Sequence, residues 1–206
     1  MKVLVLSCST GEGHNSAAKA ICEALTAIGA EYEFKDPVSF RGEETPKKIA
    51  SMYNNLIKKA PAAFGMVYKI GDAYDRSLLP SPVYAWNASY ADKLADYIKN
   101  QGFDAVITTH LYGMLALPAA KKNGDIYVPI FGVGTDYTMI PFTRNAVMDE
   151  FFVPHKDLLG FYTEKGVKEN TLNPTGIPVS PKVSAAPEKR VAREILGLPQ
   201  DKKIVL

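Results

Sequence analysis

The sequence is poor in the features that mark secreted proteins, zinc-binding domains and nucleic-acid-binding proteins. Its 206 residues include only two cysteines, Cys8 and Cys22, and contain neither a Cys-x-x-Cys nor a Cys/His zinc spacing. Two such cysteines make no disulfide framework, so we expect a reducing, cytoplasmic setting. The net charge of +2 is too small to predict a nucleic-acid partner from electrostatics.

Long hydrophobic runs are also missing. The apolar start covers only residues 3–6, whereas a secretory signal needs about 7–15 apolar residues. The longest uncharged run, residues 105–120, contains His110 and Pro118 and falls short of the ~20 apolar residues of a spanning helix. We therefore expect a protein that does not cross a membrane, although it can still bind to a membrane surface.

What the sequence does contain is the pattern of an α/β protein. Residues 3–6 are a continuous apolar run, typical of a buried parallel strand. A glycine-rich turn follows at residues 9–14, and apolar residues then recur at helical spacing from 17 to 28. Asn15 or Ser16 is expected to cap this helix and Gly29 to end it. With a second strand over residues 31–34, this βαβ unit predicts a Rossmann-like parallel sheet with helices on both faces.

The same alternation continues along the chain. Further strands are expected over residues 105–108, 126–133 and 150–153, with helices to about residue 122 and over 156–165. Between the second strand and residue 105 the pattern predicts helices, one of them amphipathic over residues 47–59. An insertion of this length is where we expect family-specific function.

The last part of the chain has a different character. Prolines at 174, 178, 181 and 187 precede a short helix over residues 188–196 and a strand that opens at residue 202. A strand without a successor predicts that a second α/β domain follows, although a terminal edge strand of the same sheet remains an alternative. We expect one domain over residues 1–185, with residues 186–206 as an interdomain helix and the first strand of a C-terminal domain.

The glycine-rich turn lies between a strand and a helix, where free backbone N–H groups favour an anion. Gly11-x-Gly13 meets two positions of the dinucleotide fingerprint, the third falls on Ser16, and Asp36 sits where an acidic residue would bind a ribose. A nicotinamide-dependent oxidoreductase is therefore one alternative. The missing third glycine and His14 inside the turn argue against it, and the absence of a Gly-Lys-Ser/Thr ending excludes a nucleoside-triphosphatase loop.

Residues 9–18, STGEGHNSAA, resemble the glycine–histidine loop of the monogalactosyldiacylglycerol synthase family. That family includes plant galactolipid synthases and bacterial processive diacylglycerol glucosyltransferases. Three further segments fit the resemblance in order and spacing: residues 108–110, residues 134–137, and residues 152–155 leading to 175–179. One departure is Glu12, which stands where many members have glycine.

The resemblance implies the N-terminal half of an inverting glycosyltransferase of the two-Rossmann (GT-B) architecture. In such enzymes the C-terminal domain grips the donor, here UDP-glucose or UDP-galactose, and no catalytic metal or other cofactor is bound. The N-terminal domain binds the acceptor, here diacylglycerol or a related lipid, and touches the membrane. It follows from the resemblance that this chain would need a C-terminal donor domain for activity and would lie peripherally on the cytoplasmic side of a membrane.

The chemistry of inversion also indicates which side chains to look for. An acceptor hydroxyl needs a base whose pKa is near neutrality, and an ordinary histidine, with a pKa of about 6.5, meets that need. We therefore expect His14 as a catalytic residue, with Asp136 either orienting it or serving as the base itself. No spacing supports a metal site, and His155 is expected to cap a helix. The residues expected to bind the acceptor or a phosphate are Gly11, Glu12, Gly13, Asn15, Ser16, His110 and Thr135.

The amphipathic segment over residues 47–59 has two interpretations. Its apolar face packs on the sheet and leaves the lysines in solvent, or the lysines meet anionic lipid headgroups while nearby aromatic residues enter the interface. The second interpretation predicts membrane contact through Lys47, Lys48, Lys58, Lys59, Phe64 and Trp86. A lipid-surface binding module without chemistry of its own is the remaining alternative for the whole chain.

Overall fold

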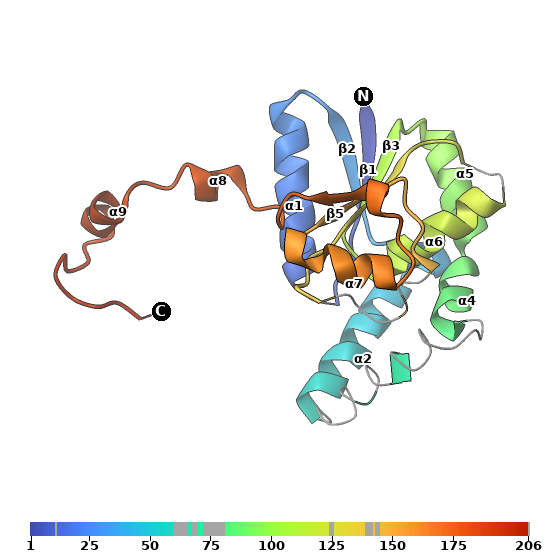
Figure 1. The fold of residues 1–206 in the computed structure, drawn as a ribbon, viewed down its shortest axis with the longest axis horizontal. Helices are drawn as coiled ribbons and strands as arrows, with labels where there is room; N and C mark the ends of the chain where they lie inside the picture. Colours follow the sequence, from blue (N-terminus) through green and yellow to red (C-terminus); the bar gives the residue numbers. More distant parts are fainter. Residues whose placement is uncertain are drawn as a thin grey trace.

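The computed structural model of the chain describes residues 1–10, 12–59, 66, 70–71, 81–123, 126–138, 142 and 145–205. Its centre is a six-stranded parallel sheet with the strand order β2-β1-β3-β4-β5-β6 (Figure 1). The strands are β1 (Lys2–Leu6), β2 (Glu31–Lys35), β3 (Ala105–Thr108), β4 (Ile130–Val133), β5 (Glu150–Val153) and β6 (Leu172–Pro174). The Rossmann-like parallel sheet expected from the sequence is confirmed.

Helices connect and cover these strands. The α-helices are α1 (Glu12–Ala27), α2 (Thr45–Lys59), α4 (Pro82–Ala88), α5 (Ala91–Gln101), α6 (Leu111–Lys122), α7 (Leu159–Glu164), α8 (Pro181–Ser184) and α9 (Lys189–Ile195). Short 3-10 helices are η1 (Pro37–Arg41), η3 (Lys156–Leu158) and η4 (Glu169–Thr171). Gly29 follows α1 with a φ of 71°, a conformation that glycine adopts without steric cost and that ends the helix there, as expected.

The two faces of the sheet are buried against different helices. Val3 and Val5 of β1 pack with Ala18 and Cys22 of α1, and this makes the smaller core cluster. Leu4 and Leu6 point to the opposite face and join the larger cluster under α5, α6 and α7. Because side chains alternate along a strand, a strand covered on both faces needs apolar residues at every position. This explains the uninterrupted apolar run at the start of the sequence.

Two element boundaries differ from the sequence expectation, and one strand is additional. The first helix begins at Glu12 rather than after a cap at Asn15 or Ser16, because the Asn15 side chain is turned inward to accept a hydrogen bond from Ser7 Oγ at 2.8 Å. Strand β4 begins at Ile130 rather than at residue 126, since Tyr127 is 90% exposed and Pro129 has no N–H for a ladder.

The third difference is β6, which the sequence did not predict. Its three residues, Leu-Asn-Pro, carry no strand signal. They form a strand because β5 offers an open edge, along which Phe151 pairs with Leu172 and Val153 with Pro174.

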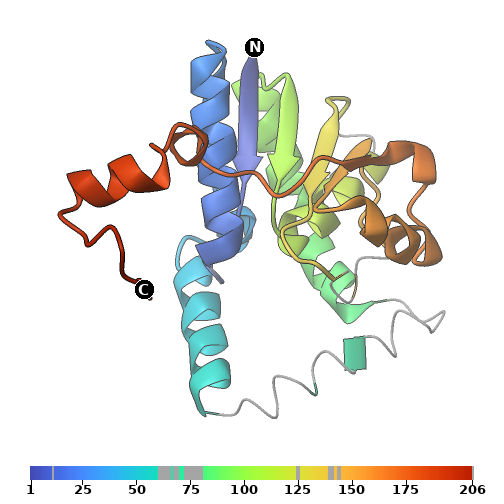
Figure 2. The ribbon, with the colours of Figure 1, turned by 60° about the vertical axis from the view of Figure 1, so that its left-hand side comes forward.

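The tail that follows β6 leaves the body of the fold. Figures 1 and 2 both show α8, α9 and the last residues extending away from the sheet beyond α1. Ser180 Oγ donates a hydrogen bond to Glu23 of α1, and none of the described residues from 186 to 205 is buried. Residues 202–205 are not in a strand, so the strand expected there is not formed. A strand needs a neighbouring strand for its hydrogen bonds, and this segment has none among the described residues.

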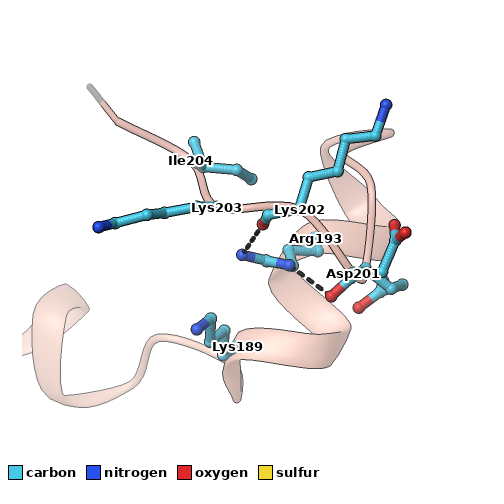
Figure 3. A pocket seen from close by; sticks show the side chains of 7 residues that line it. Lys189, Arg193, Asp201, Lys202, Lys203 and Ile204 are labelled. Atoms are coloured by element: carbon cyan, nitrogen blue, oxygen red, sulfur yellow. Dashed lines mark hydrogen bonds between the residues drawn. The ribbon is translucent and has the colours of Figure 1, made fainter.

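A single arginine shapes the end of this tail. Arg193 donates hydrogen bonds to the carbonyl oxygens of Pro199, Gln200 and Lys202 at 2.9, 2.5 and 2.9 Å. The resulting turn encloses an open pocket of about 530 Å³, which Figure 3 shows from close by. The guanidinium thus holds residues 199–202 against α9 through backbone contacts rather than through a packed apolar core.

Candidate functional site

The candidate site lies where β1, β3 and β4 end. These strands are neighbours in the sheet, and open parallel sheets place their ligands at the carboxyl ends of the strands. Residues 7–14 follow β1, Thr109 and His110 follow β3, and Thr135 and Asp136 follow β4. The fold therefore brings His14, His110, Thr135 and Asp136 to one edge of the sheet. Gly11 lies outside the described residues.

His14 is held through one of its two ring nitrogens. The half-buried side chain places Nδ1 at 2.9 Å from the backbone oxygen of Thr109 and at 2.7 Å from Thr135 Oγ1. A carbonyl oxygen only accepts hydrogen bonds, so Nδ1 must carry a proton and donate it. When the ring is neutral, its lone pair is then on Nε2. No hydrogen bond to Nε2 is found within the part of the chain that the structure describes, and this leaves Nε2 as the basic atom.

His110 is engaged through both nitrogens. Its Nδ1 accepts a hydrogen bond from the backbone N–H of Tyr112 at 3.2 Å and so caps α6. The neutral ring therefore carries its proton on Nε2, which donates to Thr10 Oγ1 at 2.8 Å. Burial, and then the nearby charge of His14, lower the pKa of His110 to about 3. With only 8% of the residue exposed, this arrangement favours a positioning role for His110 over direct contact with an acceptor or phosphate.

Two threonine–histidine contacts cross between the loops after β1 and β3. Thr10 from the first loop contacts His110 in the second, and Thr109 from the second loop contacts His14 in the first. Thr109 Oγ1 also donates to the backbone oxygen of His14 at 3.1 Å. The histidine rings meet edge to face with centroids 4.7 Å apart. We call these two threonine–histidine contacts, Thr10–His110 and Thr109–His14, the crossed pair. Thr10 and Thr109 were not among the predicted site residues. Their positions beside a glycine loop and at the end of a strand are the signal by which the sequence marks them.

Asp136 reaches His14 through Thr135. Thr135 Oγ1 donates to Asp136 Oδ2 at 3.4 Å and faces His14 Nδ1 on its other side. Among the described hydrogen bonds none joins Asp136 to His14 directly, and the Asp136 side chain is exposed. The predicted orienting role for Asp136 therefore requires the threonine hydroxyl as an intermediate.

The remaining loop residues divide into a buried and an exposed group. Asn15 is buried and holds Ser7, as described above. Glu12, Gly13 and Ser16 are exposed. The N–H groups of Glu12 and Gly13 are in the first turn of α1 and have no partner within the helix, whereas Ser16 can offer its side chain. Glu12 is in the first turn, where the partial positive charge of the helix end stabilises a carboxylate.

Asp36 has a local structural role. Its Oδ1 accepts from the N–H of Val38 at 3.0 Å and caps η1, while its Oδ2 accepts from the N–H of Ser9 at 3.4 Å. Burial raises the pKa of this carboxyl group. Both oxygens are thus used within the protein, which argues against the ribose contact that the oxidoreductase alternative requires.

The lysines expected to contact a membrane lie on α2. Lys47, Lys48, Lys58 and Lys59 are all exposed, and Lys47 pairs with Glu44 at 3.1 Å. No residue of α2 is buried. Figures 1 and 2 show the helix extending from the body beyond the carboxyl edge of the sheet. Of the apolar face of α2, Ile49 is partly buried and packs against the larger core cluster. The helix therefore contacts the body of the fold near its start, and membrane contact through its lysines stays a prediction.

Membrane contact was also predicted for two aromatic residues, Phe64 and Trp86. Phe64 lies outside the described residues. Trp86 is half-buried: its ring packs against Tyr90 and Tyr112, and the guanidinium of Arg41 sits 5.0 Å from its centroid.

Two general findings concern the described part of the chain. It contains no helix that is long and apolar enough to cross a membrane. Across the same residues, no three His, Cys, Asp or Glu side chains are grouped closely enough to hold a metal ion. His155 caps η3 by accepting from the N–H of Asp157 at 3.3 Å, so the expectation that it caps a helix is confirmed.

The fold and site define a Rossmann-like α/β protein in which the ring of His14, held through Nδ1, lies at the carboxyl edge of the sheet. Comparison with known proteins identifies its family. The chain belongs to the monogalactosyldiacylglycerol (MGDG) synthase family, whose sequence model matches residues 14–179, and the resemblance noted from the sequence is thereby confirmed.

Curated relatives carry one shared name. Proteins from Bacillus cytotoxicus, Bacillus cereus and Bacillus mycoides, each named processive diacylglycerol beta-glucosyltransferase, are 24% identical to it over 208 residues. The match covers 100% of this chain and 52% of each relative, so the chain spans about half the length of the curated relatives it matches. Among solved structures, the lipopolysaccharide outer core galactosyltransferase WaaB in its apo form aligns with a TM-score of 0.46. That alignment has 11% identity and covers 84% of this chain and 44% of that one.

Proposed function

We propose that this chain is the acceptor-binding part of an inverting glycosyltransferase that moves a hexose from a UDP-sugar to diacylglycerol. Family membership and the names of the relatives support the reaction class and the lipid acceptor. Those names also favour UDP-glucose over UDP-galactose as the donor. The observation that carries the proposal is His14, whose Nδ1 donates to Thr109 while its Nε2 lone pair is left for a substrate.

In the proposed reaction His14 is the general base. The acceptor hydroxyl donates a hydrogen bond to Nε2, and its oxygen attacks the anomeric carbon from the side opposite the leaving group. The new carbon–oxygen bond forms as the bond to UDP breaks, UDP leaves with the electron pair, and the hydroxyl proton passes to Nε2. The resulting imidazolium keeps its Nδ1 proton on the Thr109 oxygen. Base catalysis of this kind contributes about 10²–10⁴-fold to the rate.

Asp136 supports this step through Thr135. The Nδ1–H of the charged ring is shared between the Thr109 oxygen and Thr135 Oγ1, and Thr135 donates its own proton to the carboxylate. The negative charge of Asp136 is therefore coupled to the imidazolium by a shared hydroxyl. The N–H groups of Glu12 and Gly13 in the first turn of α1, with the side chain of Ser16, are proposed to contact the acceptor or a donor phosphate.

We further propose that a donor-binding domain completes the enzyme. Residues 1–185 would be the acceptor domain, and residues 186–206 the connection to the donor domain and its first strand. Two observations support this division: the curated relatives are about twice as long as the matched region, and the described residues from 186 to 205 bury no side chain. The donor sugar would be bound mainly by the second domain and would meet His14 between the two.

The third part of the proposal is peripheral attachment to the cytoplasmic side of a membrane through α2. This helix is amphipathic, has four exposed lysines and extends beyond the edge that carries His14. Lipid that enters along α2 would therefore arrive near the base. Each lysine close to an anionic leaflet contributes about 1 kcal/mol of binding.

The catalytic proposal is tested with His14→Gln in the full-length protein, by following transfer of labelled glucose from UDP-glucose to diacylglycerol in mixed micelles. We expect kcat to fall at least tenfold while the thermal unfolding midpoint changes little. The matched control is His155→Gln, which removes an exposed histidine at the same edge of the sheet and is expected to leave turnover unchanged. Equal turnover in wild type and His14→Gln would remove His14 from the mechanism.

Membrane attachment is tested by flotation with vesicles of phosphatidylcholine, with or without phosphatidylglycerol. Replacing Lys47, Lys48, Lys58 and Lys59 by glutamate should lower the affinity for anionic vesicles at least tenfold, since each lysine contributes about 1 kcal/mol. The control replaces four exposed lysines on other elements, namely Lys19, Lys93, Lys122 and Lys168, and changes the net charge equally. If both variants bind alike, the attachment is not specific to α2.

A further inference from the structure

Thr109 has contacts in the site that suggest a role beyond packing. The sheet holds it in place independently of these contacts. It is the first residue after β3, and it is 1% exposed. Its backbone N–H donates to the oxygen of Leu6 at 3.1 Å, which continues the pairing of β3 with β1 by one residue. The Thr109 backbone oxygen and hydroxyl are therefore held by the sheet itself rather than by a loop.

From this position Thr109 makes two contacts with His14. Its backbone oxygen accepts from Nδ1–H of the ring at 2.9 Å, and its Oγ1 donates to the backbone oxygen of His14 at 3.1 Å. One contact fixes the ring and the other fixes the main chain that carries it. The ring contact is available from any residue at position 109, whereas the main-chain contact requires a hydroxyl.

We propose that the Thr109 hydroxyl is a positioning group that sets the tautomer of His14, a role that rests on the proposed function of His14 as base. The hydroxyl holds the first turn of α1 at the distance at which the imidazole reaches the Thr109 oxygen. That contact keeps the proton on Nδ1 and the lone pair on Nε2. Without the hydroxyl the ring is released toward the mixture of tautomers that a free imidazole populates, and part of the protein presents the wrong nitrogen to the acceptor.

The histidine content of the chain makes this role measurable. There are three histidines. His110 accepts a hydrogen bond at Nδ1 from the N–H of Tyr112, so its neutral ring carries the proton on Nε2. His155 Nδ1 lies 3.3 Å from the N–H of Asp157 and 3.2 Å from the carboxylate of the same residue, so these contacts do not fix its tautomer. His14 is expected to carry the proton on Nδ1, and its signals are identified by their loss in His14→Gln. Long-range ¹H–¹⁵N spectra of histidine-labelled chain at pH 8, where an ordinary histidine is neutral, distinguish the two forms directly.

The test compares wild type with Thr109→Val and Thr109→Ser. In Thr109→Val the ratio of Nδ1–H to Nε2–H at His14 should fall by about 2–12-fold, the range for loss of one hydrogen bond. Thr135 still contacts the ring, so the loss should be partial. In the full-length protein, kcat with UDP-glucose and diacylglycerol should fall in proportion to the fraction of His14 that carries the proton on Nδ1, while KM stays within about twofold. Thr109→Ser keeps the hydroxyl and should behave like wild type in both assays.

The neighbouring Thr108 provides the matched control. It is buried, and its Oγ1 donates to the backbone oxygen of His110 at 3.2 Å without touching His14. Thr108→Val should therefore cost stability of the same kind and leave the His14 tautomer and kcat unchanged. The Nε2–H signal of the buried His110 reports whether each variant is folded.

Each outcome has a defined meaning. A wild-type spectrum with the proton mainly on Nε2 of His14 overturns the proposal without any variant. An unchanged tautomer ratio in Thr109→Val, or an equal loss in Thr109→Ser, also overturns it. A fall in the Nδ1–H fraction of His14 without a matching fall in kcat supports the positioning of His14 and refutes His14 as the base, so the inference and the proposed function fail in different ways.

Discussion

Acidification should destabilise the wild-type chain more than a His110→Asn variant, because His110 must stay neutral in the folded state. Its pKa falls from an ordinary value of 6.5 to about 3 on folding, through burial and then the proximity of His14. Between these two values the unfolded chain binds a proton that the folded chain does not. Stability is therefore complete above pH 6.5, is lost as the pH falls toward 3, and is lost no further below that.

The size of the effect follows from the shift. Each pH unit within the window costs about 1.4 kcal/mol, so His110 removes roughly 2–3 kcal/mol of unfolding free energy between pH 7 and pH 4.5. That is a large part of the 5–15 kcal/mol typical of a domain. Asn is chosen because it can still cap α6 by accepting from Tyr112, and it does not titrate in this range.

The assay is urea unfolding at several pH values, followed by the fluorescence of Trp86, the single tryptophan, whose ring contacts Tyr112 beside the His110 cap. The unfolding free energies of wild type and His110→Asn should converge or cross as the pH falls. Asp36, whose pKa is raised by burial, favours the folded state on acidification, but both proteins contain it and its effect cancels in the difference. A difference that stays constant within about 0.5 kcal/mol from pH 7 to pH 4.5 would refute a neutral, buried His110.

Two further predictions concern packing and the tail. A Cβ at Gly113 would lie 2.2 Å from Thr108 Oγ1, so Gly113→Ala should destabilise the chain by about 1–3 kcal/mol. Gly160→Ala meets nothing within 4 Å and should be neutral or stabilising by up to about 1 kcal/mol, and equal unfolding midpoints for the two variants would contradict this difference in space. A chain ending at residue 185 should melt within about 2 °C of the full chain, because none of the described residues from 186 to 205 is buried; calorimetry showing a larger loss would mean that the tail packs on the body.

Local patterns were sufficient to predict the centre of the fold. Strands β1 and β3 are buried on both faces and so appear as continuous apolar runs, while α1 and α5 end at Gly29 and Gly102 in left-handed conformations that only glycine adopts easily. The predicted start of β4 was wrong, because an apolar composition does not by itself make a strand. Residues 126–129 are apolar enough for a strand, yet they form a loop that ends in a proline.

The contacts of the site could not be predicted in the same way. His14 and Thr109 are 95 residues apart in the chain, and Thr10 and His110 are 100 apart. No spacing rule connects such positions. Parallel strands share a direction, so residues that follow neighbouring strands come to the same edge, but which hydroxyl meets which ring nitrogen depends on the three-dimensional register of β1 and β3. Thr10 and Thr109 are common residues without a chemical signature, and only their contacts single them out.

The crossed pair has a consequence for how this edge can be redesigned. Each of the two loops supplies one hydroxyl and one imidazole to the other, so neither loop carries a complete set of partners. Transplanting residues 9–14 alone into a homologous scaffold would break both contacts at once, whereas moving them together with residues 108–110 would preserve them. Chimaeras between relatives should therefore exchange the two segments together.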